Sequence, residues 1–148
     1  MNIFIGADHR GYAMKEGLVS WMKEQGFTVE DVGATDFTEG DDYPDYATLV
    51  AQKVAEDTEN NRGILLCGSG VGMAVAANKL AGIRAANIES VDVAKSARND
   101  DDINVLSLGA DTISLDDAQA ITATFLQTPF AQSERHVRRI EKIKRLES

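Results

Sequence analysis

The segment Cys67-Gly68-Ser69-Gly70-Val71-Gly72 has the residue types and spacing that point most directly to chemistry. It follows an apolar run and precedes a run of small residues, as at a turn from a strand to a helix. Glycines in such a turn let the backbone approach a ligand and direct N–H groups toward an anion. The same N–H groups favour the thiolate form of a cysteine that faces them. The segment therefore indicates an anion-binding loop in which Cys67 acts as a nucleophile or as a base.

Counting residues excludes three familiar glycine loops. A dinucleotide-binding fingerprint requires a glycine at position 73, and a Cys-x5-Arg phosphatase loop requires an arginine there, but the residue is Met73. A nucleotide-binding loop requires Gly-Lys-Ser/Thr, and the next lysine is Lys79. The simpler alternative is that Cys67 only packs in the core, since cysteine is among the most buried residue types. The glycines that follow Cys67 favour the functional interpretation.

Metal chemistry is not indicated by the remaining candidate ligands. His9, His136 and Cys67 lie in three different segments, which is not the spacing of a structural zinc site. The acidic run Asp100–Asp102 could bind a cation, but a solvated loop is the simpler interpretation of such a run. We therefore expect neither a metal nor a cofactor. With one cysteine, the chain cannot form an internal disulfide.

Charge and hydropathy restrict the class of partner. The net charge of -9 argues against nucleic acid and against a membrane surface, because both are anionic. Basic residues gather near the C-terminus, from Arg135 to Arg145, and such a patch suits a small anionic ligand. The chain contains no run of about 18 apolar residues, and its first residues lack a basic leader. These features predict a cytoplasmic protein.

Short apolar runs alternate with segments of helical period, which predicts the elements that must position these residues. The predicted strands are 3–7, 27–32, 63–67, 83–87 and 104–108, and the predicted helices are 14–25, 44–57, 73–80, 91–98, 115–126 and 133–146. Continuous apolar strands separated by helices are typical of a parallel sheet covered on both faces. We expect one α/β domain over residues 1–148, a doubly wound, mostly parallel, five-stranded, Rossmann-like sheet. Ligands bind such sheets at the carboxyl ends of the strands, where Asp8-His9 and Cys67–Gly72 are expected.

Several motifs occur in one order along the chain and carry a family resemblance. They are Gly6-Ala7-Asp8-His9-Arg10-Gly11, Asp42-Tyr43-Pro44-Asp45-Tyr46-Ala47, the Cys67 segment, Gly82-Ile83-Arg84-Ala85-Ala86, Asn104-Val105-Leu106-Ser107-Leu108-Gly109 and Arg135-His136-Val137-Arg138-Arg139. Together they resemble the ribose-5-phosphate isomerase B family, which also includes galactose-6-phosphate isomerase subunits. The resemblance runs from the first strand to the last helix.

The resemblance implies a metal-free interconversion of aldose and ketose phosphates through an enediolate. It makes Cys67 the base that moves a proton between C1 and C2, with Ser69 near the sugar hydroxyls. Asp8 would contact these hydroxyls or move a proton between oxygens. Fixed donors would stabilise the enediolate oxygen. The loop residues implied in substrate binding are Gly68, Gly70, Val71 and Gly72.

The resemblance also implies how phosphate is bound and how the site is assembled. His9, Arg135 and Arg139 would hold the phosphate, since arginine is well shaped for bidentate phosphate contacts. The two arginines are four residues apart and so share one side of the predicted C-terminal helix, about 133–146. A site completed across a homodimer, or a pair of dimers, is implied.

Three residues depart from the family pattern. Asp100 stands where the ring-opening histidine is expected, Asp101 where asparagine is expected, and Asp111 where an arginine contributes to phosphate binding. A free aspartate, with a pKa of about 3.9, is a poor acid near neutral pH. Either Asp100 takes over the histidine's role, or ring opening is left to solution or to Asp8, or the substrate is another sugar, including an unphosphorylated one.

Two classes of function follow from these residues. The first is an active isomerase, which is favoured because Cys67, the glycine loop, Asp8, His9 and the two arginines Arg135 and Arg139 are intact. The second is a catalytically weak relative that binds sugar phosphates as a sensor or partner subunit. Cys67 discriminates between them, because a protein freed from catalysis has little reason to keep a cysteine in this setting.

Overall fold

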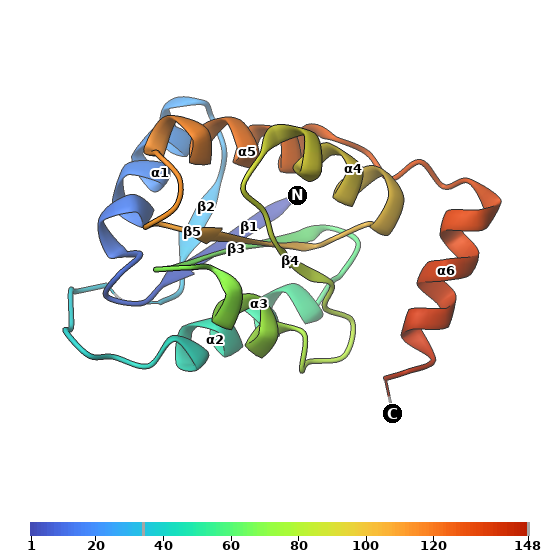
Figure 1. Cartoon of the computed structure of the whole chain (residues 1–148), viewed down its shortest axis with the longest axis horizontal. Coiled ribbons are helices and arrows are strands. Elements are labelled where there is room, and N and C mark those ends of the chain that lie inside the picture. The colour runs from blue at the N-terminus through green and yellow to red at the C-terminus, as the bar shows by residue number, and fades with distance from the viewer. Residues whose placement is uncertain (34, 148) are drawn as a thin grey trace.

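One parallel sheet organises the chain. The computed structural model describes residues 1–33 and 35–147, in which five strands follow the order β2-β1-β3-β5-β4 (Figure 1). The strands are β1 (Asn2–Ala7), β2 (Val29–Asp31), β3 (Asn61–Cys67), β4 (Ala85–Asn87) and β5 (Val105–Gly109). Every neighbouring pair is parallel. The prediction of a five-stranded doubly wound α/β sheet is confirmed, and the sheet is parallel throughout rather than mostly.

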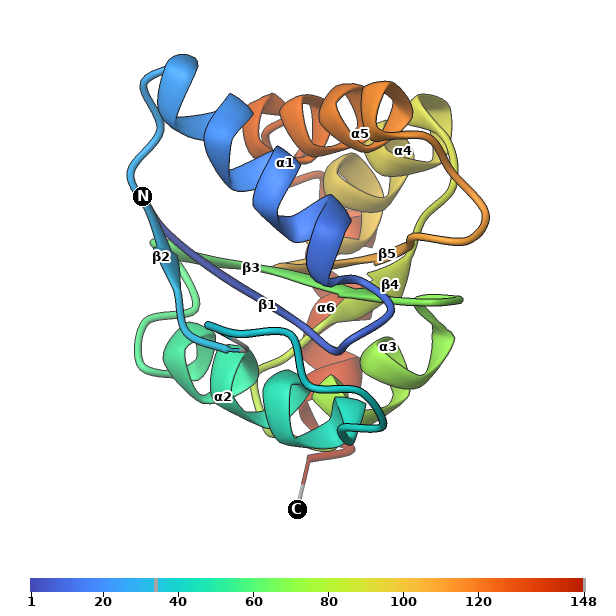
Figure 2. The same cartoon turned by 90° about the vertical axis from the view of Figure 1, so that its left-hand side faces the viewer.

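Helices cover both faces of the sheet, as predicted. Figure 2 shows α1 (Tyr12–Glu24), α4 (Val91–Asp101) and α5 (Leu115–Gln127) on one face, and α2 (Tyr43–Ala55) and α3 (Val71–Ala77) on the other. Helix α6 (Glu134–Lys144) stands beside these layers (Figure 1). Among the described residues, no helix has the length and apolar character needed to cross a membrane.

Strand alternation divides the core into two layers and orients Cys67. Successive side chains of β3 point to opposite faces of the sheet. Ile64 and Leu66 join the apolar cluster under α1, α4 and α5, whereas Leu65 and Cys67 join the cluster under α2 and α3. Burial on both faces explains why this strand reads as an unbroken apolar run. Cys67 thus ends β3 on the side where α3 begins.

Element boundaries follow local chemistry, and several differ from the predicted ranges by two or three residues. The Ser114 hydroxyl accepts a hydrogen bond from the Asp117 N–H at 3.1 Å, which caps α5. Gly26 has φ +84° and ends α1. Helix α3 begins at Val71, two residues before the predicted start, and β2 is restricted to Val29–Asp31. Val71 and Gly72, which the sequence assigned to the loop, therefore lie in the first turn of α3.

The acidic run is not the solvated loop that the sequence suggested. Asp100 and Asp101 lie in the last turn of α4, and Asp102 ends it with φ 47°. The Asp102 carboxylate accepts hydrogen bonds from Arg84 Nη2 at 2.9 Å and Arg98 Nη1 at 2.7 Å. Asp102 thereby links α4 to the segment that leads into β4, and two arginines occupy the carboxylate that a cation would need.

Replacing Asp102 tests this linkage. Asp102→Ala leaves the largely buried Arg98 and Arg84 without their carboxylate. We expect the free energy of unfolding to fall by about 2–4 kcal/mol, because removing one partner of a buried pair leaves the other charge uncompensated. Urea unfolding followed by circular dichroism measures the change. The exposed neighbour Asp101→Ala is the matched control, and an equal loss in both variants would contradict the assignment.

Candidate active site

The strand order places Asp8 beside Cys67. Ala7 at the end of β1 pairs with Leu66 of β3, and the Asp8 N–H donates to the Leu66 carbonyl at 3.2 Å. The chain leaves β1 outward to β2 and then crosses to β3 on the other side of β1. Such a topological switch point opens a crevice at the carboxyl ends of the strands. Asp8 and Cys67 therefore both lie at the edge of the sheet where the sequence predicted them.

A backbone amide contacts the Cys67 sulfur. The Gly70 N–H donates to Cys67 Sγ at 3.1 Å, and the cysteine is 5% exposed. This donor fixes the position of the sulfur at the carboxyl end of β3. The geometry therefore suits a cysteine that gives up its proton and accepts it back.

Gly70 can make this contact because its backbone is left-handed. Its φ is +79°, and an added Cβ would lie 2.2 Å from Asn87 Oδ1 and 2.9 Å from the Leu108 carbonyl carbon. Only glycine fits both the conformation and the space. The position thus requires a glycine for two independent reasons.

Two side chains that the sequence did not single out hold the glycine loop. The Ser107 hydroxyl donates to the Gly70 carbonyl at 2.6 Å from inside β5. Asn87, at the end of β4, donates through Nδ2 to the Ser69 carbonyl at 3.1 Å. The sequence features that could have identified them are a serine within an apolar strand and an asparagine at the end of a strand. Their role is to position the loop from two neighbouring strands.

The remaining predicted loop residues lie where β3 passes into α3. The Ser69 hydroxyl accepts from the Val71 N–H at 3.3 Å. Gly72 faces the ring of Tyr43, which an added Cβ would approach to 2.6 Å. Gly68 lies in the same way against the guanidinium of Arg10. The loop is therefore packed closely by side chains from the N-termini of other segments.

Asp8, a predicted site residue, also caps a turn. It is 4% exposed, and its Oδ1 accepts from the N–H groups of Arg10 at 2.9 Å and Gly11 at 3.0 Å. These bonds turn the chain from β1 into α1. They also fix the Asp8 carboxylate at the strand end beside Cys67.

His9 is held by Asp41, a partner that the sequence did not reveal. Asp41 Oδ1 accepts from the His9 backbone N–H at 2.9 Å and lies 2.8 Å from the ring Nδ1. Burial raises the pKa of the Asp41 carboxyl, but the contacts with His9 and Tyr46 outweigh it, so the pKa lies below its ordinary value of 3.8. Burial and the neighbouring Asp41 raise the pKa of Tyr46. Asp41 therefore stays ionised and orients the imidazole.

The group Asp8, His9 and Asp41 has the ligand types of a cation site. One ligand atom from each lies within 4.8 Å of the others. However, Asp41 Oδ1 is already engaged by His9, and Asp8 Oδ1 by two backbone donors. The contacts in this group are those of a positioned imidazole.

Asp100, Asp101, Arg135 and Arg139 lie away from Cys67. Helix α4 follows the carboxyl end of β4 and runs back along the sheet, so its last turn lies at the opposite edge (Figure 1). Helix α6 lies beside that end of α4 (Figure 1). One chain thus brings the loop, Asp8 and His9 together but leaves the other four predicted residues in a second group.

The second group has its own contacts. His136 is buried on α6 and its Nε2 lies 3.6 Å from Asp100 Oδ1, which also accepts from Asn99 at 2.6 Å. Arg135 and Arg139 are exposed on α6, and within the described part of the chain neither forms an ion pair. Two unpaired guanidinium groups on one helix side are available to an anion.

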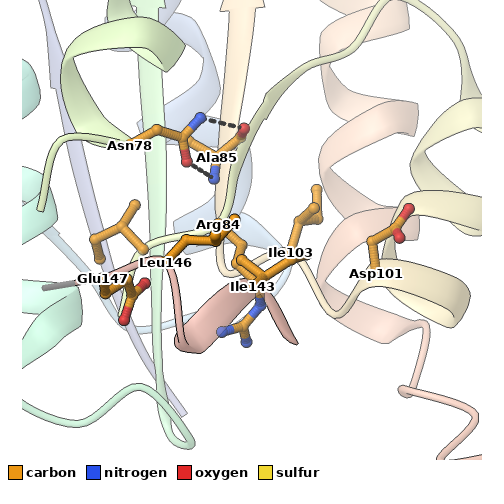
Figure 3. Close-up of a pocket in the computed structure, with 9 residues that line it drawn as sticks. Asn78, Arg84, Ala85, Asp101, Ile103, Ile143, Leu146 and Glu147 are labelled. Carbon is orange, nitrogen blue, oxygen red and sulfur yellow. Dashed lines mark hydrogen bonds between the residues drawn. The ribbon is translucent and has the colours of Figure 1, made fainter. Parts of the chain in front are cut away.

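A pocket of about 390 Å³ lies between α6 and the amino-terminal side of the sheet (Figure 3). Ile83, Ile103, Ile143 and Leu146 supply its apolar wall, and Asp101 lies at one end. Asn78 closes another side with two hydrogen bonds to the backbone of Ala85, at 2.9 and 2.7 Å. Asp101 is the predicted site residue in this lining, and the pocket does not include Cys67.

Comparison with known proteins identifies the family. Residues 3–143 match the family model described as Ribose/Galactose Isomerase. The chain belongs to this isomerase family. It is 42% identical to a probable ribose-5-phosphate isomerase B of Mycoplasma genitalium over 99% of this chain and 95% of that protein. It is 40% identical to ribose-5-phosphate isomerase B of Escherichia coli over 98% and 95%.

Solved structures of family members share the whole fold. The Mycoplasma genitalium isomerase with bound ribulose 5-phosphate superposes with a TM-score of 0.95 at 42% identity, covering 99% of this chain and 95% of that one. The type B ribose 5-phosphate isomerase of Trypanosoma cruzi gives 0.93 at 42% identity, covering 99% and 98%. The family fold therefore extends over the complete sheet and all six helices.

The glycine loop of this isomerase fold can be tested at Gly70. Gly70→Ala must place a methyl group against Asn87 and the β5 backbone, whereas Gly26→Ala has nothing within 4 Å at a similar φ of +84°. We expect Gly26→Ala to cost about 1 kcal/mol and Gly70→Ala clearly more, because only the latter adds a clash to the strain. Thermal unfolding of both variants measures the difference. Equal losses would mean that conformation alone requires glycine at position 70.

Proposed function

We propose that this chain is an aldose–ketose isomerase that interconverts ribose 5-phosphate and ribulose 5-phosphate with Cys67 as the base. The observation that carries the proposal is the Gly70 N–H donated to Cys67 Sγ beside Asp8 at the switch point of the sheet. The family relationship and the relative with bound ribulose 5-phosphate support the choice of sugar. Residues 1–148 act as one isomerase domain.

The proposed chemistry moves one proton between neighbouring carbons. The Cys67 thiolate takes the proton from C2 of the open-chain aldose, and the C–H electrons form the C1–C2 double bond of an enediolate as the C1 carbonyl becomes an oxyanion. The resulting thiol returns the proton to C1, which leaves the carbonyl at C2. Because the sulfur receives and gives back the same proton, a buried cysteine held by one fixed donor is sufficient.

The groups around Cys67 handle the oxygens. The oxyanion at O1 needs a donor already in place, which the Gly72 N–H in the first turn of α3 would supply, because the N–H groups of Gly70 and Val71 donate to Cys67 Sγ and Ser69 Oγ. A proton must also pass from O2 to O1, and the Asp8 carboxylate beside Cys67 is placed to relay it. Ser69 and Gly68 contact the sugar hydroxyls. His9, oriented by Asp41, binds the phosphate end.

The second group of residues reaches Cys67 from another copy of the chain. Asp100, Asp101, Arg135 and Arg139 lie at the opposite edge of their own sheet, so a two-fold axis can set them against the partner's glycine loop. Exposed apolar side chains mark the surfaces that would meet. They are Val71 and Val75 on α3, and Val137 and Ile143 on α6 with Leu146 beyond it, which is 81% exposed. A homodimer, or a pair of dimers, would contain two complete sites.

Within that dimer, Asp100 takes the ring-opening role. Its side chain is half exposed, and its Oδ1 lies 3.6 Å from Nε2 of the buried His136. Asp101 would bind a sugar hydroxyl, and Arg135 and Arg139 the phosphate. The aspartate and histidine together supply the acid–base group that the family pattern places at position 100.

We place the reaction in the cytoplasm. A cysteine base works only as a free thiol, and reducing conditions keep it free. The chain's one cysteine is free in the structure.

Turnover of purified protein tests the base. Without added metal, native protein should convert ribose 5-phosphate to ribulose 5-phosphate, and Cys67→Ser should lower kcat by about 10³-fold, the contribution of a positioned base. Free ribose, allose and a hexose 6-phosphate serve as competing substrates. Thermal unfolding of Cys67→Ser checks that the variant folds. Full activity in a folded Cys67→Ser variant would refute the assignment, and turnover of a different sugar alone would refute the substrate.

Mixing two inactive variants tests the shared site. In a mixed dimer of Cys67→Ala and Arg139→Ala chains, one of the two sites contains a native Cys67 and a native Arg139. Random exchange of equal amounts should therefore restore about a quarter of the native activity. If both residues acted within one chain, mixing would restore nothing. Each variant alone, carried through the same exchange procedure, is the control.

A further inference from the structure

Arg10 lies on the glycine loop beside the proposed base. The three atoms nearest to an added Cβ on Gly68 all belong to the Arg10 guanidinium, at 2.0 to 2.4 Å. Asp8 fixes the Arg10 backbone through the bond from its N–H at 2.9 Å. The guanidinium therefore lies at the mouth of the crevice, against Gly68, the residue that follows Cys67 in the sequence.

Asp111 holds the guanidinium there. Arg10 Nη2 donates to Asp111 Oδ2, and the Asp111 N–H donates to the Gly68 carbonyl at 2.9 Å. Both ends of this ion pair are thus tied to the same loop. About half of each side chain is exposed, at 55% and 52%. An ion pair as exposed as this one contributes little to folding, so stability does not account for its placement.

The charge balance of the crevice calls for a cation. Asp111 lies against the loop, Asp8 lies at the neighbouring strand end, and Asp41 lies against His9, so three carboxylates gather on this side of a chain of net charge -9. Lys15 is fully buried and bound to Asp31 at 2.5 Å, so it does not reach a ligand. Arg10 is the arginine that, among the described residues, lies against this loop. A doubly charged ligand bound beside this loop would lie near this guanidinium.

We propose that Arg10 is a specificity-determining residue that binds the phosphate of the substrate at the mouth of the Cys67 crevice, with Asp111 as its positioning residue. A guanidinium carries five N–H donors in a planar fork. It can keep one bond to Asp111 and direct the others to phosphate oxygens, which a lysine could not do with the same geometry. Asp111 thereby makes the cation rigid before the ligand arrives.

The inference rests on the proposed function for its substrate, so its test includes a binding measurement. Arg10→Met should raise KM for ribose 5-phosphate by about 10–100-fold, the loss expected for a charge-assisted hydrogen bond, with kcat changed by less than about threefold. Calorimetric titration of ribose 5-phosphate into Cys67→Ser protein, with and without Arg10→Met, should show the same loss of affinity. Lys95→Met, an exposed substitution on α4, is the control for a lost positive charge.

A second experiment moves the guanidinium from position 10 to position 111. Because the two side chains meet, the double substitution Arg10→Ala with Asp111→Arg returns a guanidinium to the same place and should recover most of the affinity that Arg10→Ala loses. Unchanged affinity in Arg10→Met, or an equal loss for Lys95→Met, would overturn the inference. If native protein does not turn over ribose 5-phosphate but binds it in an Arg10-dependent way, the proposed function fails and the inference stands.

Discussion

The contact between the Gly70 N–H and Cys67 Sγ is the interaction on which the rest of the site depends. It requires a left-handed residue immediately before α3, in a space that Asn87 and the β5 backbone leave only to glycine. Ser107 then fixes the Gly70 carbonyl from inside the sheet. Each of these side chains comes from a different strand, so the sulfur is positioned only when β3, β4 and β5 have paired. The site is thus a direct consequence of sheet assembly.

Sheet direction explains why one chain divides the candidate residues into two groups. Strands deliver their last residues to one edge, and the helices that follow return to the other. Asp8 follows β1 and Cys67 ends β3, whereas Asp100 lies in the last turn of α4, and the segment after α5 places α6 beside that turn. If a second copy of the chain places its Asp100 and α6 residues against the first copy's Cys67 loop, the two groups of residues meet without any rearrangement within one chain. A symmetric pair satisfies this with the same surfaces twice.

Electrostatics and burial give the two groups different characters. Around Cys67 the carboxylates of Asp8 and Asp41 are engaged by backbone and histidine donors and serve to orient neighbours. On α6, two guanidinium groups stand exposed on one side of a helix whose buried side chains are only His136 and Ile140. A reaction that moves a proton at one end of an anionic substrate has use for both environments: a dry, fixed one for the proton and a cationic one for the phosphate.

The sequence alone determined the layout of the fold and singled out Cys67 as the proposed base. An apolar run such as 63–66 indicates a strand that is buried on both faces of the sheet. The glycines after Cys67 indicate a backbone conformation or a close approach that only glycine allows. Both features can be recognised from a short stretch of sequence. Element boundaries were less accurate, as the early start of α3 shows, because caps depend on neighbours. Only the tertiary structure paired His9 with Asp41 and Arg10 with Asp111, partners 32 and 101 residues apart. It also separated Asp100 and Arg139 from Cys67, since distances between residues far apart in sequence are decided by strand order and helix direction rather than by local pattern.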